Sequence, residues 1–122
     1  MIYRVVFSCL LAGVLWCSGH SAARAHAFVA RASPAVGSTV HTPPTEVRIQ
    51  FTEALEPAYS TARVQDASGA TVSAAAHVDP NEKSVLIVPL GALKPGRCKV
   101  TWKVLSVDSH VTNGTFTFTV AP

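Results

Sequence analysis

Residues 96–120 read GRCKVTWKVLSVDSHVTNGTFTFTV and contain two runs in which apolar and polar side chains alternate. In the first run Cys98, Val100, Trp102 and Val104 are separated by lysine and threonine. In the second run two phenylalanines and a valine alternate with threonines over residues 115–120. A period of two is typical of a β-strand with one buried face. Both runs are therefore predicted as strands with one face in a core.

The same alternation recurs upstream, where Val47, Ile49 and Phe51 share one face. Four weaker strand candidates are Phe28–Ser33, Ala62–Ala67, Thr71–Ala75 and Ser84–Pro89, and Ala74–Ala76 could form at most a helical turn. Turn residues separate these segments; they include Pro43-Pro44, Ser68-Gly69, Pro95-Gly96 and Asn113-Gly114. About seven short strands at this spacing predict an all-β fold, a seven-stranded antiparallel Greek-key β-sandwich or barrel of cupredoxin-like or Ig-like type.

The N-terminal end has the order of a secretory signal peptide: a positive charge at Arg4, an apolar run over residues 5–17, then small residues. A run of this length is too short for a membrane-spanning helix, which needs about 20 apolar residues. Cleavage after an A-x-A-like sequence would expose Arg24, His26 or Phe28 as the first residue, and the pattern alone does not choose among them.

If cleavage exposes His26, the signal peptide is 1–25 and the mature domain is 26–122. This domain has 97 residues, eight Lys+Arg against seven Asp+Glu, no methionine and one cysteine, Cys98. It is too short for a two-lobed cofactor enzyme, too weakly basic for a nucleic-acid-binding surface, and unable to form an internal disulfide.

Three features carry candidate metal chemistry. A terminal His26 offers its amine and imidazole as a nitrogen chelate suited to Cu(II). Asp108 and His110 are two apart and face the same way in an extended backbone, so both side chains can reach one ion, or the carboxylate can orient the imidazole. Glu53 lies two residues after Phe51 and so faces the same side, which makes it a candidate ligand or hydrogen-bond partner. Each feature alone also fits an ordinary surface side chain.

Together these segments resemble the CopC family of periplasmic copper-binding, copper-resistance proteins. The resemblance rests on HAFVARASPAVGSTV, VRIQFTEAL and the pattern W-x-V-x-S-x-D-x-H-x-x-x-G-x-x-x-F-x-V from Trp102 to Val120. It implies a mature chain that begins with His26 and a Cu(II) site made of the terminal amine, its imidazole, Asp108 and His110, with Glu53 nearby. Some members also carry a methionine-rich Cu(I) site. The mature chain has no methionine, so we expect it to bind Cu(II) only, one ion per chain.

The resemblance implies a monomeric, non-enzymatic carrier, buffer or scavenger of copper in the periplasm, with a separate inner-membrane partner of the CopD type. One alternative is a copper monooxygenase with a histidine brace, although 97 residues leave little room for its substrate face. Another is an Ig-like structural module without metal.

The remaining chemically active side chains have simpler interpretations. Cys98 and Trp102 are predicted in the core, and His41 and His77 on the surface. Four basic residues on one edge are interpreted as a solvated face that also guards against edge pairing; they are Lys94, Arg97, Lys99 and Lys103.

Overall fold

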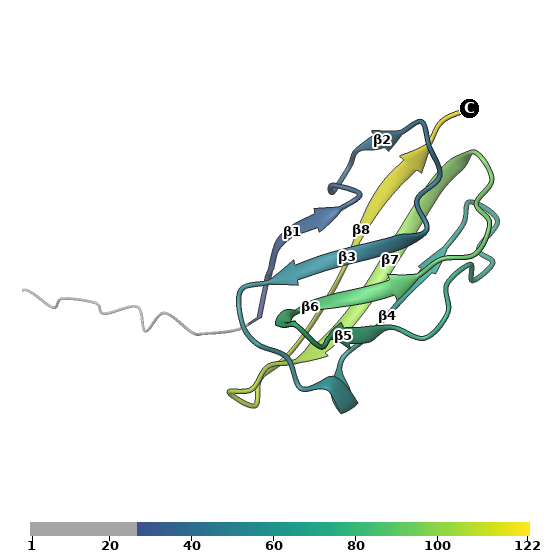
Figure 1. The fold of residues 1–122 in the computed structure, drawn as a ribbon. Coiled ribbons are helices and arrows are strands. Elements are labelled where there is room, and N and C mark those ends of the chain that lie inside the picture. The colour runs from purple at the N-terminus through teal and green to yellow at the C-terminus, as the bar shows by residue number, and fades with distance from the viewer. Residues whose placement is uncertain (1–26) are drawn as a thin grey trace, which may run out of the picture.

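Two four-stranded sheets face each other in the computed structural model, which describes residues 27–122 (Figure 1). The predicted signal peptide, its cleavage site and His26 lie outside the described residues. No helix in the described part of the chain is long and apolar enough to cross a membrane.

The first sheet, sheet A, has the strand order β1-β3-β6-β5, and every neighbouring pair is antiparallel. Its strands are β1 (Val29–Ser33), β3 (Glu46–Phe51), β5 (His77–Asp79) and β6 (Glu82–Pro89). Sheet B has the order β2-β8-β7-β4. Its strands are β2 (Thr39–Val40), β4 (Thr61–Gln65), β7 (Gly96–Leu105) and β8 (Val111–Val120).

The core lies between the sheets and consists of the alternating apolar rows of the sequence. Val47, Ile49 and Phe51 of β3 are buried against a row from β7 that includes Cys98 and Trp102. The rings of Phe51 and Trp102 meet edge to face with centroids 5.1 Å apart, which joins the two sheets. The predictions that Cys98 and Trp102 are core residues are confirmed.

The predicted all-β sandwich is confirmed, with two differences. The described residues contain eight strands rather than seven, because β2 and β5 have only two and three residues and carry no clear alternation. In addition, β2 pairs with β8 in parallel, whereas an entirely antiparallel fold was expected.

The segment between β4 and β5 was predicted wrongly. Residues 71–75 form no strand but two isolated bridges, Thr71 with Gln65 in sheet B and Ser73 with Leu90 beside sheet A. Residues 74–76 form no helical turn; instead a 3-10 turn, η1, occurs at Pro57–Tyr59. The segment crosses from one sheet to the other, so neither sheet supplies it with a full row of hydrogen-bond partners.

Asn113-Gly114 is not a turn, although the dipeptide is a common turn signal. Both residues lie inside β8, where Gly114 is opposite Trp102. A Cβ atom at Gly114 would stand 2.7 Å from Cζ2 of the Trp102 ring, so the glycine is needed for close packing beneath the indole.

One end of the sandwich gathers segments that are far apart in the sequence. The start of β1, the end of β3 and the loop between β7 and β8 all lie at this end, and the C-terminus lies at the other (Figure 1). We call it the site end, because the loop contains Asp108 and His110.

Replacing Gly114 with alanine tests the packing of Trp102. We expect Gly114→Ala to lower the free energy of unfolding by about 1–3 kcal/mol, the usual cost of overfilling a packed core. Gly91→Ala is the matched control, because its Cβ would meet only the Val72 carbonyl oxygen, at 3.5 Å. Urea unfolding measures both; equal stabilities for the two variants would contradict the packing role.

Candidate metal centre

The loop between β7 and β8 is a closed turn that is stabilised by hydrogen bonds inside the loop and by one to a neighbouring segment. The Ser106 amide donates to the His110 carbonyl at 3.0 Å, and the Ser109 amide donates to the Ser106 carbonyl at 2.9 Å. Ser109 has a φ of 71°, a left-handed conformation that tightens the turn. The Val107 amide donates to the Ala54 carbonyl at 3.0 Å, which fixes the loop to the segment that follows β3.

Asp108 is the centre of the hydrogen bonds inside this loop. Its Oδ1 accepts from the Ser106 hydroxyl, from the His110 amide at 3.3 Å and from His110 Nδ1 at 3.2 Å. These donors, the Ser106 hydroxyl above all, hold the pKa of the Asp108 carboxyl below its usual value. The carboxylate therefore stays ionised, as a metal ligand must.

The structure brings Asp108 and His110 together, as the sequence predicted, and leaves both accessible. The Asp108 side chain is 30% exposed and the His110 side chain 55% exposed. Two ligands of one metal ion with bonds of about 2.0 Å lie roughly 2.8–3.3 Å apart in tetragonal or tetrahedral geometry. The 3.2 Å between Oδ1 and Nδ1 fits that spacing. It equally fits a carboxylate that accepts from Nδ1–H and orients Nε2 toward a metal.

The start of the described chain is anchored beside this loop. Ala27 is fully buried, and its carbonyl accepts a hydrogen bond from the Thr112 hydroxyl at 2.7 Å. Thr112 is two residues beyond His110 at the start of β8. Phe28 and Thr52 exchange two further bonds, from the Phe28 amide to Thr52 Oγ1 at 3.0 Å and from the Thr52 amide to the Phe28 carbonyl at 2.9 Å.

Glu53 lies at the same end. Its neighbours in the chain are both tied to site-end segments, Thr52 to Phe28 and Ala54 to Val107. The Glu53 side chain is partly buried. Within residues 27–122, no three His, Cys, Asp or Glu side chains are close enough together to hold a metal ion. Asp108 and His110 thus form a pair, and the predicted nitrogen chelate of His26 lies outside the described residues.

Two residues of the site were missed in the sequence. Ser106 is completely buried, and its hydroxyl donates a hydrogen bond to Asp108. Because Ser106 lies two residues after the inward-facing Val104, the alternation of β7 could have predicted its burial. Thr112 holds Ala27 across 85 positions of sequence, a contact for which no local pattern exists.

The other candidate ligands are far from the loop or on the surface. Cys98 is buried and lies seven residue steps, about 23 Å of extended strand, before Leu105 at the end of β7. Burial raises the pKa of the Cys98 thiol, which favours the inert form. His41 and His77 are exposed, as predicted.

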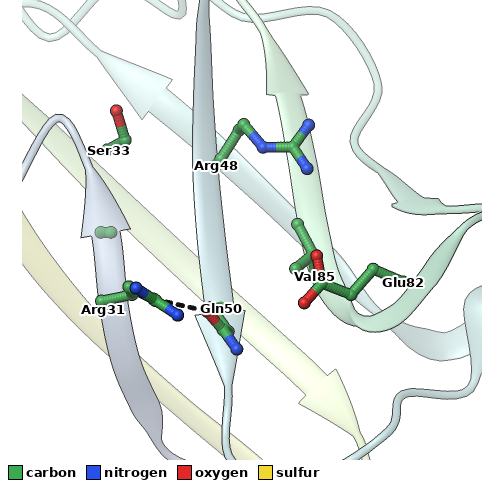
Figure 2. A pocket seen from close by; sticks show the side chains of 7 residues that line it. Arg31, Ser33, Arg48, Gln50, Glu82 and Val85 are labelled. Atoms are coloured by element: carbon green, nitrogen blue, oxygen red, sulfur yellow. Dashed lines mark hydrogen bonds between the residues drawn. The ribbon is translucent and has the colours of Figure 1, made fainter.

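A pocket of about 160 Å³ on the outer face of sheet A is lined by arginines rather than by a set of metal ligands (Figure 2). Arg31 and Arg48 line it, but Arg31 Nε donates to Gln50 Oε1 at 2.6 Å and Arg48 is paired with Asp79 at 2.8 Å. Figure 2 also shows the Glu82 carboxylate at its rim. No metal ligand set lines this pocket, and its cations already have partners.

Comparison with known proteins supports the resemblance. Residues 29–121 match the CopC domain family model. Protein YobA of Escherichia coli strain K12 is 35% identical over 98 residues, which cover 79% of each chain. Copper resistance protein C of Pseudomonas syringae pv. tomato is 30% identical over 105 residues, 80% of this chain and 82% of that protein.

Solved structures agree with these relatives. The crystal structure of CopC from Methylosinus trichosporium OB3b has a TM-score of 0.75 and 33% identity, and covers 80% of this chain and 95% of that one. PcoC of Escherichia coli, described as a methionine-rich copper resistance protein, has a TM-score of 0.69 and 30% identity over 79% and 99% of the chains. The present chain has one methionine, Met1.

Replacing Ser106 with alanine tests the hydrogen bonds that hold Asp108. A carboxyl with a lowered pKa stabilises the fold above its ordinary pKa, and this contribution is lost as the pH falls through the folded-state value. Ser106→Ala should therefore raise the pKa of Asp108, and its loss of stability should be larger at neutral pH than in acid.

NMR titration of the metal-free protein gives the pKa, and urea unfolding at several pH values gives the stability. Ser38→Ala is the control, because the Ser38 hydroxyl donates to the Ala35 carbonyl and to no carboxylate. An Asp108 pKa that does not change in Ser106→Ala would show that the hydroxyl has no such effect.

Proposed function

Because the chain belongs to the CopC family of copper-resistance proteins, we propose that its mature form binds one Cu(II) ion in the periplasm. The ligands are the amine and imidazole of an N-terminal His26, the Asp108 carboxylate and the His110 imidazole. The observation that carries the proposal is the pairing of Asp108 with His110 beside the anchored start of β1.

The anchor at Ala27 supports the assignment of His26. Ala27 is fully buried and bonded to Thr112, so a chain that begins one residue earlier would have its first Cα atom one step of about 3.8 Å from this anchor. Thr112 is two residues from His110. A terminal amine and imidazole at this position would need little chain ordering to reach the same ion, which lowers the entropic cost of binding.

The chemistry of the donors favours Cu(II). Two imidazoles, one amine and one carboxylate are nitrogen and oxygen ligands of the kind that tetragonal Cu(II) prefers. Cu(I) is bound best by soft thioether and thiolate ligands. The mature chain contains no methionine, and its one cysteine is buried away from the loop. We therefore propose a single site specific for the oxidised ion.

Two roles for Asp108 remain within this proposal. As a ligand, its Oδ1 binds copper next to His110 Nδ1. As an orienting group, it accepts from Nδ1–H and directs Nε2 to the metal. We infer for Glu53 a hydrogen bond or an additional oxygen ligand at the same site, since both of its neighbours are tied to site-end segments.

The exposure of the site suits an ion that is handed on. Asp108 and His110 lie on a surface loop, so a partner or chelator can approach the metal without unfolding the domain. We propose a non-enzymatic carrier, buffer or scavenger of copper that acts as a monomer. A separate inner-membrane protein of the CopD type is the expected partner.

Adding one residue before His26 tests the terminal amine as a ligand. The extension replaces the amine with an amide and should abolish most of the Cu(II) affinity, because it removes one arm of the chelate. The affinity of the authentic chain should also fall as the pH drops below about 7.7–8.0, the usual pKa of an α-amine. Competition titration measures both; undiminished binding by the extended chain excludes the amine.

Replacing His110 with alanine tests the imidazole. Loss of a residue that merely orients a ligand typically costs about 10–100-fold in metal affinity, so loss of the ligand itself should cost about 100-fold or more. His77→Ala is the matched control, since His77 is exposed on β5 in the other sheet. Similar losses in the two variants, measured by the same competition titration, would contradict the assignment.

A further inference from the structure

Acidic side chains are distributed unevenly between the two sheets. Among residues 27–122 basic and acidic side chains are nearly balanced, eight to seven, yet the strands of sheet B contain four basic residues and no acidic one. The four are exposed and alternate with core residues, so they share the outer face of the sheet; they are Arg63, Arg97, Lys99 and Lys103. Arg97, Lys99 and Lys103 are solvated, as predicted, but their predicted position at a sheet edge is wrong, because β7 lies between β8 and β4.

The strand register gathers some of these groups around one hollow. Thr61 is opposite Lys103, and Arg63 is opposite Thr101. These four side chains surround a hollow on the outer face, with Ala62 and Trp102 at its base. Lys103 and Arg63 stand diagonally across it, at the roughly 7–8 Å spacing of diagonal neighbours in a sheet. The lining of this hollow is mostly apolar, and the two cations and two hydroxyls around it are suited to bind a carboxylate.

These cations are not neutralised by the protein itself. Within the described residues neither Arg63 nor Lys103 forms an ion pair or a side-chain hydrogen bond, whereas Arg48 on sheet A is paired with Asp79. Asp66, just beyond β4, accepts from Ser68 and Ala70 and lines a different hollow, with Lys94. Glu56 lines a hollow on the other side, with Lys83.

A second hollow adjoins the first and leads to the site end. It shares Thr61 and Lys103 with the first hollow and is also lined by Tyr59, Leu105 and Val111. Tyr59 is 71% exposed and Val111 is 56% exposed, large values for large hydrophobic side chains. Val111 follows His110 directly, so the second hollow borders the β7–β8 loop.

We propose that the outer face of sheet B binds an acidic segment of a partner protein. One carboxylate of the segment lies between Arg63 and Lys103, and a neighbouring apolar side chain fills the hollow beside Tyr59 and Val111. Exposed tyrosine and arginine are favoured at protein interfaces. A protein segment fits better than an anionic membrane, because a bilayer surface cannot enter two adjoining hollows. The contact needs no bound copper, and it places the partner next to Asp108 and His110.

The test uses the metal-free domain with a synthetic peptide in which Asp and Glu alternate with Leu and Phe. NMR chemical shifts on titration should change at Arg63, Lys103 and Val111 and leave the outer face of sheet A unaffected. Binding should weaken as salt is added, because exposed charges are screened. The same peptide with Asn and Gln in place of its acids should bind much less.

Charge reversal on each face supplies matched variants. Arg63→Glu with Lys103→Glu should weaken binding about tenfold, since two favourable surface pairs become repulsive. Arg31→Glu with Lys83→Glu changes the net charge equally on sheet A and should leave binding within about twofold. The milder pair Arg63→Gln with Lys103→Gln guards against misfolding and should give an intermediate loss.

Three outcomes would overturn the proposal: equal losses for the two faces, equal binding of the uncharged peptide, or no peptide binding at all. Binding to vesicles rich in phosphatidylglycerol without binding to the peptide would also overturn it, in favour of a membrane surface.

Discussion

Ten consecutive residue pairs join β7 to β8, from Gly96–Val120 to Leu105–Val111, and the rest of the molecule depends on this register. A shift by one residue would turn every core side chain of one strand to the solvent. The same register sets Gly114 against the Trp102 ring and closes the hairpin at Ser106, the last inward position. The loop that contains Asp108 and His110 thus has a fixed place at the end of the longest ladder in the described part of the fold.

The segments that flank β1 and β3 of sheet A hold the site end through their backbone carbonyls. The Ala54 carbonyl holds the loop at Val107, and the Thr112 hydroxyl holds the first described residue, Ala27. Both contacts join segments that are distant in sequence, and both lie within a few residues of the Asp108–His110 pair. The arrangement is therefore preorganised before any metal binds, which reduces the entropy that binding must overcome. The basic face of sheet B ends beside the same loop, so the proposed metal exchange and the proposed docking share one region of the surface.

Much of this fold could be predicted from alternation, because β3, β7 and β8 each bury one face. The segments that were missed or mistaken, β2, β5 and residues 71–75, are too short or too irregular for a period to appear. Asn113-Gly114 was wrongly predicted as a turn. Glycine is needed there because the Trp102 ring packs against it, and this tertiary contact outweighs the local turn preference.

At the site, the sequence predicted that Asp108 and His110 lie close together, and they do, although in a closed turn rather than in an extended backbone. Their role as metal ligands stays a prediction. Ser106 was within reach of the same reasoning, since a serine at an inward position of β7 needs a buried hydrogen-bond partner. The contact between Thr112 and Ala27 was out of reach, because it exists only once the two sheets have packed. The placement of the basic residues on a face rather than an edge also required the strand order.

The central claim is that the chain holds one Cu(II) ion with nitrogen from its own N-terminus and from the β7–β8 loop. The electron paramagnetic resonance spectrum of a chain that begins at His26, recorded as Cu(II) is added, tests this directly. A site with one amine, two imidazoles and one carboxylate should give a single tetragonal signal that saturates at one equivalent, with hyperfine coupling to three nitrogens. The same spectrum from a chain that begins at Ala27, or a signal that does not saturate at one equivalent, would contradict it.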